Sequence, residues 1–157
     1  MEGRSKDTLG YEVVRAVDYH TIRNQKYLKN WQCYVEDLIA SGNVTDAAIY
    51  NFDAMCLASS KPDFGLTLQE YSHIMYGYTN TAALLDAGLS VNRVKYDVTY
   101  ADGRRAIMAK VGLPASGCTI CRTNGLLLVG VHSSKISARR CNSQITRLCD
   151  FFVDKNL

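Results

Sequence analysis

Apolar residues recur at helical spacing near both ends of the 157-residue chain. In residues 31–39, Val35, Leu38 and Ile39 can face a protein core, and the Ser-Gly-Asn run at 41–43 predicts the end of that helix. A second helix is predicted over residues 137–154, where one side would be formed by Cys141, Ile145, Leu148, Cys149 and Phe152. Two helices with one apolar side each need a sheet on which to pack.

Between these helices the pattern changes to the short apolar runs and the alternation that are typical of β-strands. Strands are predicted at residues 47–50, 55–58, 94–100, 105–111, 118–122 and 126–131, with a shorter extended piece at 89–91. Asp102-Gly103 and Asn124-Gly125 predict tight hairpin turns. Because consecutive strands are joined by hairpins, the central sheet should be antiparallel.

Thr67 is followed three residues later by Glu70, which is the spacing of a capping box and predicts the start of a third helix. A further helical turn is predicted at residues 82–85. The fold class that follows is α+β, with a central antiparallel sheet and both terminal helices packed on one face.

The length fits one domain, which we place at residues 30–157. Residues 1–29 form an N-terminal extension with six basic and four acidic side chains, a local charge of +2, and only a broken apolar stripe. The extension can be partly helical or flexible. It is either an arm that binds a partner or regulates the domain, or a frayed terminus.

The net charge of +3 is too mild to indicate a nucleic-acid-binding protein. The sequence contains no run of about twenty apolar residues and no apolar signal-peptide segment, so a cytosolic location is expected. The six cysteines should then be free thiols. Cys118 and Cys121 have the spacing of a metal-binding or redox pair, but alternation along a strand would direct them to opposite faces.

Sequence motifs of catalysis are missing: we find no phosphate-binding loop, no Gly-x-Ser-x-Gly and no carboxylate pair at useful spacing. The three histidines are scattered, and His132, which follows an apolar strand, is expected at the surface. We therefore predict a binding protein without enzymatic activity, without a metal and without a cofactor.

Two large aromatic side chains, Trp31 and Tyr34, stand three residues apart and so lie on one side of the first predicted helix. They can close the core beneath that helix, or they can form an exposed ledge on which a ligand stacks. The residues alone leave both interpretations open.

Motifs in the right order over residues 30–157 resemble those of the profilin family. The opening W-Q-C-Y-V-E-D-L at 31–38 is similar to the family's W-x-x-Y-[VI]-D-x-L, and L-A-S-S at 57–60 lies where the family has W-A-x-S. Further similar segments are residues 45–49, 95–96, 109–112, 119–123, 126–130, 141–142 and the closing 147–154. The resemblance implies the profilin fold, in which smaller helices cover the second face of the sheet.

The resemblance also implies a cytoplasmic, cytoskeletal protein, expected to be a monomer, that binds monomeric actin and regulates actin polymerisation. Profilins bind proline-rich proteins on aromatic residues of the first and last helices, where a polyproline II helix can pack its rings. The matching positions here are Trp31, Tyr34, Arg147, Leu148 and Phe151. Leu57 replaces a second tryptophan of the family, so binding of proline-rich ligands is expected to be weakened.

Actin binds profilins through the later strands and the start of the last helix. The matching positions are Leu85, Lys95, Val98, Tyr100, Met108, Lys110, Lys135, Arg139 and Arg140. Tyr100 and Met108 stand where relatives often have arginine, a loss that Arg104 or Arg105 could offset in part. The same basic residues are where the family binds phosphoinositide head groups, through charge attraction.

Two alternatives to a typical profilin stay open. The first is a divergent profilin with little actin binding that acts mainly as a phosphoinositide- or partner-binding module; it is motivated by Leu57, Tyr100 and Met108. The second is a small-molecule sensor domain of similar architecture, which would need a sizeable apolar pocket.

Overall fold

The computed structural model describes residues 30–157, and the predicted N-terminal extension lies outside them. The chain divides into two units, Met1–Tyr34 and Val35–Leu157, and helix α2 (Trp31–Ala40) crosses the division. At the C-terminal end of α2, the Ser41 hydroxyl donates to the Leu38 carbonyl over 2.6 Å and Gly42 adopts a positive φ of 78°. This is the helix end that the sequence predicted.

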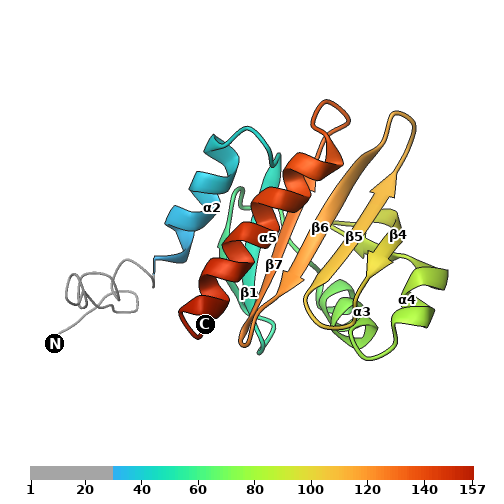
Figure 1. Ribbon diagram of the computed structural model, residues 1–157, viewed down its shortest axis with the longest axis horizontal. Coiled ribbons are helices and arrows are strands. Elements are labelled where there is room, and N and C mark those ends of the chain that lie inside the picture. Colours follow the sequence, from blue (N-terminus) through green and yellow to red (C-terminus); the bar gives the residue numbers. More distant parts are fainter. Residues whose placement is uncertain (1–29) are drawn as a thin grey trace, which may run out of the picture. The chain divides into compact units, whose positions relative to one another are not determined.

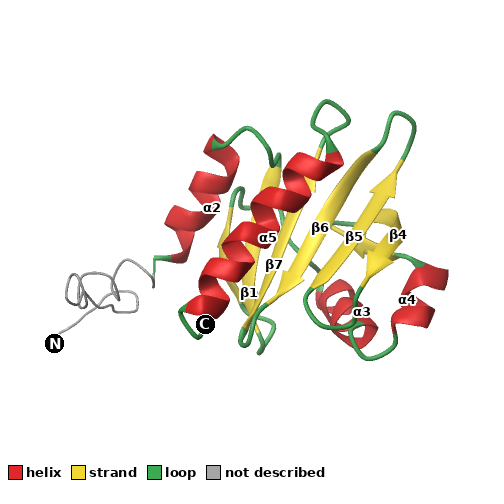
Figure 2. Ribbon diagram, in the orientation of Figure 1, coloured by secondary structure: helices red, strands yellow, loops and turns green. Residues whose placement is uncertain are grey.

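One antiparallel sheet forms the centre of the second unit (Figures 1 and 2). In the order β2-β1-β7-β6-β5-β4-β3, its seven strands within residues 35–157 are β2 (Cys56–Ser59), β1 (Asp46–Asn51), β7 (Leu126–His132), β6 (Ser116–Arg122), β5 (Ala106–Val111), β4 (Val94–Ala101) and β3 (Leu89–Val91). Each neighbouring pair is antiparallel. The predicted antiparallel sheet is confirmed.

Helices cover both faces of this sheet (Figure 1). One face carries α5 (Ala138–Asp154), which contacts β6 and β7, together with the part of α2 from Val35 onward. The other face carries α3 (Leu68–Gly77) and α4 (Thr81–Ala87), whose Ile74 and Leu84 are buried in the main core. The predicted arrangement, with terminal helices on one face and smaller helices on the other, is confirmed.

The interior between the sheet and the smaller helices is filled with packed side chains. The fully buried members of this core include Ile74, Leu84, Ile107, Ile120 and Leu127. A filled core on this face counts against the small-molecule sensor.

The start of α3 is fixed by the capping box that the sequence predicted. The Thr67 hydroxyl accepts from the Glu70 backbone N–H over 3.1 Å, and Glu70 Oε1 accepts from the Thr67 N–H over 2.9 Å. The second carboxylate oxygen of Glu70 accepts from the Arg93 N–H over 2.7 Å. Although Glu70 is only 8% exposed, its charge is satisfied, and it joins α3 to the β3–β4 turn.

The inward side of α5 is formed by Cys141, Ile145, Cys149 and Phe152, all buried, and the Ser137 hydroxyl accepts from the Arg140 N–H at the start of the helix. Leu148, which the spacing placed on that side, is partly exposed. Cys118 lies in the core shared with α3, whereas Cys121 faces Cys149 of α5. The two cysteines of the C-x-x-C spacing therefore point to opposite faces, as expected.

His132 does not lie at the surface. It is the last residue of β7 and is 5% exposed, with Nδ1 2.9 Å from the Ser133 carbonyl oxygen. Its neighbour across the ladder is Gly117, where a Cβ atom would approach His132 Nε2 to 2.8 Å. The missing side chain at Gly117 makes room for the imidazole, which explains the burial.

Candidate functional site

The face of the sheet that carries α5 is open over β4 and β5 (Figure 1). Cross-strand partners share a face, and Tyr100 is paired with Met108, which is paired with Thr119. The Thr119 hydroxyl donates to Asn142 Oδ1 on α5, which places this row on the α5 side. A continuous row of side chains therefore leads from β4 across β5 to the last helix.

A second row on the open face is charged. Lys110 on β5 is paired with Asp97 on β4, so these two side chains share one face. Lys95 lies two residues before Asp97, and its side chain runs along the edge of this face next to Gly88. Lys95, Asp97 and Lys110 are exposed, and Tyr100 is 48% exposed. The open face thus combines two cations and one carboxylate with an exposed phenol and the half-buried Met108.

Val98 is placed differently from the other residues of the predicted actin site. It is 8% exposed and packs in the main core, so it has little surface to offer a partner. The ladder between β4 and β5 is irregular between Val98 and Tyr100. This bulge turns Tyr100 to the face opposite Val98, although residues two apart in a regular strand share a face.

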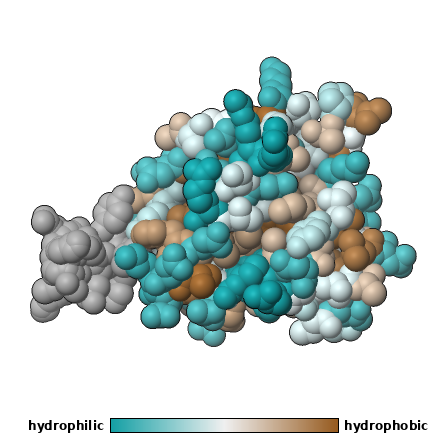
Figure 3. Space-filling model, in the orientation of Figure 1, coloured by the Kyte–Doolittle hydropathy of each residue, from teal (hydrophilic) through white to brown (hydrophobic). Residues whose placement is uncertain are grey.

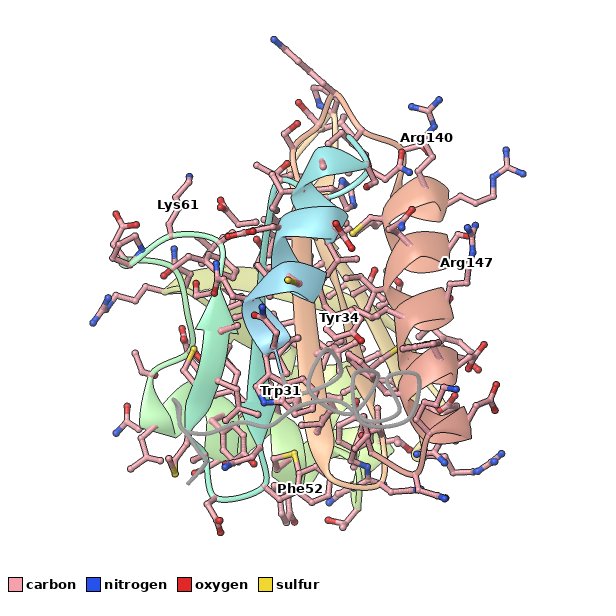
Figure 4. All side chains as sticks on the ribbon, turned by 90° about the vertical axis from the view of Figure 1, so that its left-hand side faces the viewer. Trp31, Tyr34, Phe52, Lys61, Arg140 and Arg147 are labelled. Atoms are coloured by element: carbon pink, nitrogen blue, oxygen red, sulfur yellow. The ribbon has the colours of Figure 1, made fainter. Side chains whose placement is uncertain are left out.

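The remaining predicted positions lie around the open face. Leu85, 46% exposed, is on α4, which packs against β4. The cations Lys135, Arg139 and Arg140 are exposed in the loop before α5 and in its first turn, and Figure 4 shows Arg140 projecting from that end of the helix. The structure thus brings a cluster of basic side chains to the N-terminal end of α5.

Arg105 is not placed to offset the lack of an arginine at positions 100 and 108, which the resemblance suggested it could do in part. Its Nη1 donates to the Arg122 carbonyl over 3.1 Å, which holds its guanidinium against β6. Arg104 is exposed.

Leu113, in the β5–β6 turn, is 98% exposed and was not singled out from the sequence. Its position between Gly112 and Pro114, in a predicted loop, could have indicated an exposed apolar side chain.

The second candidate surface includes the outer side of α5. Arg147 and Phe151 are four residues apart on this side; Figure 4 shows Arg147 pointing away from the sheet, and Phe151 is 39% exposed. Lys155 Nζ lies 5.7 Å from the centre of the Phe151 ring. Figure 3 shows hydrophilic side chains over most of α5 and apolar atoms at its C-terminal end.

The two aromatic residues of α2 differ in exposure. Trp31 is partly exposed, whereas Tyr34 is 7% exposed. Of the ledge that the sequence suggested, Trp31 therefore offers more surface than Tyr34. Leu57, which the sequence resemblance placed where the family has a second tryptophan, is half-buried on β2.

A groove of about 500 Å³ lies between the start of α3 and the β3–β4 turn. Its lining includes Glu70, His73, Arg93 and Lys95. His73 Nε2 is 3.0 Å from the Gly88 carbonyl oxygen, and both carboxylate oxygens of Glu70 accept backbone N–H groups. These two side chains therefore serve the local structure.

Three of the four buried thiols in the described part of the chain, Cys118, Cys121 and Cys141, are poor nucleophiles. Burial raises the pKa of Cys141 to about 11, and burial also raises the pKa of Cys118 far above its usual range. The hydrogen bond with Cys149 raises the pKa of Cys121. Because the thiolate is the reactive form, these three cysteines act as small apolar residues of the core.

No helix among residues 30–157 has the length and apolar character needed to cross a membrane.

Solved structures of several profilins share this fold. Acanthamoeba castellanii profilin IB is 29% identical, with a TM-score of 0.74 over 81% of this chain and 99% of that chain. Schizosaccharomyces pombe profilin is 23% identical, also with a TM-score of 0.74 and the same coverage. Mouse profilin IIa, solved in complex with a double repeat from the FH1 domain of mDia1, is 20% identical, with a TM-score of 0.70, and covers 81% of this chain and 99% of its own.

The family model described as Profilin matches residues 29–157, which is most of the chain and includes the whole sheet and all the helices of the described part. The order of strands, the helices on both faces and the solved relatives agree with that match. The chain belongs to the profilin family.

Proposed function

We propose that this protein is a non-catalytic, cytoplasmic regulator of actin polymerisation that binds actin monomers through the open face of β4 and β5 and the N-terminal end of α5. The observation that carries the proposal is the exposed face itself. This chain belongs to the profilin family, and it leaves this part of its sheet uncovered. The side chains on the uncovered part are Lys95, Lys110, Tyr100 and Met108.

The chemistry of this face suits a protein partner with an acidic surface. Exposed cations at Lys95, Lys110, Arg139 and Arg140 would orient the partner and raise the association rate. The Tyr100 ring supplies apolar contact area in the middle of the charged surface, and rings of this kind commonly anchor interfaces.

Titration of pyrene-labelled actin monomers with the full-length protein tests the proposal. We expect sequestration or slower spontaneous nucleation at micromolar protein. Lys110→Glu should weaken actin binding by roughly tenfold, because it reverses a charge at the centre of the face. Lys155→Glu, the same charge reversal at the other end of α5, is the matched control and should leave actin binding unchanged. An unchanged affinity of Lys110→Glu would remove Lys110 from the interface.

We further propose that proline-rich ligands bind through Trp31 and Tyr34 of α2 and through Arg147, Leu148 and Phe151 of α5. The exposure of Trp31 and Phe151 supports this, since aromatic faces are what a polyproline II helix packs against. The mouse profilin IIa complex carries a ligand of this type, the FH1 double repeat. Because Leu57 offers no indole ring, the affinity should be lower than in relatives with a tryptophan there.

A second candidate function is a phosphoinositide- or partner-binding module with little affinity for actin. It is favoured by Tyr100 and Met108, which put a phenol and a thioether where relatives often have arginine. Co-sedimentation with vesicles that contain a phosphoinositide, compared with vesicles of neutral lipid, measures this activity. Vesicle binding together with no effect on actin at a large excess of protein would favour this second function over the first.

A further inference from the structure

We propose that Phe52 and Met55, in the turn between β1 and β2, form an additional docking point for proline-rich ligands. The inference rests on the proposed binding of such ligands and extends it to residues that the sequence motifs do not include. It accounts for two large apolar side chains, 43% and 58% exposed, that stand within four residues of each other.

The turn that carries these side chains is held in one conformation. Asn51 Oδ1 accepts from the N–H groups of Asp53 (2.9 Å) and Met55 (3.0 Å), and the Asn51 N–H donates to the Met55 carbonyl over 3.0 Å. From α3, the Tyr71 hydroxyl donates to the Asn51 carbonyl over 2.9 Å. A turn fixed on two sides presents Phe52 and Met55 with little conformational freedom left to lose on binding.

The position of the turn suits the same ligand as the outer side of α5. Figures 1 and 4 show that the β1–β2 turn, where Phe52 is labelled, lies at the end of the sheet at which α5 ends, opposite the end that carries Arg140. Phe151 is exposed near that end of α5. Along the chain, Met55 precedes Leu57 by two residues, so the turn continues directly into the strand that lacks the expected indole.

The chemistry of the two side chains favours an extended, ring-bearing ligand. A phenyl ring and a thioether offer apolar, polarizable surface, on which pyrrolidine rings can pack without hydrogen bonds. A polyproline II helix extends by about 3.1 Å per residue and is already ordered, so a segment of moderate length can span separated apolar points on one surface. Phe52 and Met55 would thus supply part of the contact area that Leu57 does not.

Calorimetric titration of the full-length protein with a synthetic peptide of about fourteen prolines tests the inference. We expect the double variant Phe52→Ser/Met55→Ser to bind this peptide roughly five- to tenfold more weakly than the unaltered protein. Leu113→Ser is the matched control: it removes an exposed apolar side chain from a turn at the other end of the sheet and should bind as the unaltered protein does. Thermal unfolding should show that both variants are folded.

The outcomes separate this inference from the proposed function. Equal affinity of the double variant and the unaltered protein would overturn the role of Phe52 and Met55 while leaving proline binding intact. No binding by the unaltered protein would overturn both. If sedimentation showed a dimer that the double variant abolishes, with peptide affinity unchanged, the turn would be a self-association surface and the inference would be wrong.

Discussion

At the scale of single residues, Tyr78 shows how a polar group is kept in the core. It is 5% exposed, its hydroxyl donates to the Arg105 carbonyl over 3.0 Å, and the Arg122 guanidinium lies 4.2 Å from the centre of its ring. Burial raises the pKa of the Tyr78 phenol far above its usual value of about 10. The phenol therefore stays neutral in the folded protein well into the alkaline range.

Replacing Tyr78 by phenylalanine should lower stability at neutral pH, and this loss should become smaller at alkaline pH. At pH 7 the variant loses the hydrogen bond to Arg105 and should be less stable by about 0.5–1.5 kcal/mol. Because the pKa is higher in the folded state, the unfolded tyrosine loses its proton first. The contribution of Tyr78 to the free energy of unfolding is therefore fully present below the pKa of the tyrosine in the unfolded chain, and it is lost as pH rises above that value.

Urea unfolding of both proteins between pH 7 and pH 11 measures these two effects. The stability difference should narrow above pH 10, a threshold set by the pKa of about 10 of an unfolded tyrosine. A difference that stayed constant over the whole range would contradict the argument, since the other tyrosines are common to both proteins.

Trp31 is the residue whose substitution separates the two candidate surfaces. Trp31→Ala should abolish or greatly weaken binding of a proline-rich peptide and leave actin binding nearly unchanged, because the open sheet face contains no residue of α2. The chain has a single tryptophan, so the variant has no indole fluorescence and calorimetry must be used. If Trp31 instead supports the core, the substitution would cost several kcal/mol, and both activities would fall together.

At the scale of elements, the position of α5 depends on a missing side chain in β7. A Cβ atom on Gly130 would lie 2.5 Å from Ile145 Cδ1 and 2.9 Å from Cγ1, and Ile145 is fully buried. The helix therefore lies close to the strand because residue 130 is glycine. The open face over β4 and β5 depends in turn on this placement, since α5 packs mainly on β6 and β7.

Gly130→Ala should destabilise the protein by about 1–3 kcal/mol through overpacking. Ile145→Val alone removes a buried methyl group and should cost about 0.5–1.5 kcal/mol. In the double variant the shorter valine makes room for the new methyl group, so the combined loss should be smaller than the sum of the two single losses. Gly125→Ala, where no atom lies within 4 Å of the added Cβ, is the control and should be nearly neutral. Strict additivity in urea unfolding would show that the two positions do not compete for space.

The regular elements could be predicted from the sequence because their signals are local. The capping box at Thr67 and Glu70, the hairpin at Asp102-Gly103 and the apolar spacing of α5 each depend on a few neighbouring residues. Departures from regularity were less accessible. The bulge that separates Val98 from Tyr100 and the space at Gly117 that admits His132 arise from pairing between strands.

At the scale of the whole molecule, surfaces were the hardest feature to predict. Spacing showed which side of α5 is buried, but it did not show that β4 and β5 stay uncovered or that Phe52 and Met55 are exposed. Exposure depends on what every other element covers, and this is settled only in the assembled fold. The family resemblance supplied the site residues, and the structure removes Val98 from the surface.

A chain that begins at residue 30 should fold by itself, because residues 35–157 contain a complete seven-stranded sheet with its core and the family model begins at residue 29. We expect its urea midpoint to match that of the full-length protein and its actin affinity to be unchanged. A higher affinity of the shortened chain for a proline-rich peptide would show that residues 1–29 cover the aromatic surface and compete with the ligand. A loss of stability on deletion would show instead that the extension packs on the domain, and the domain boundary placed before Asn30 would then be wrong.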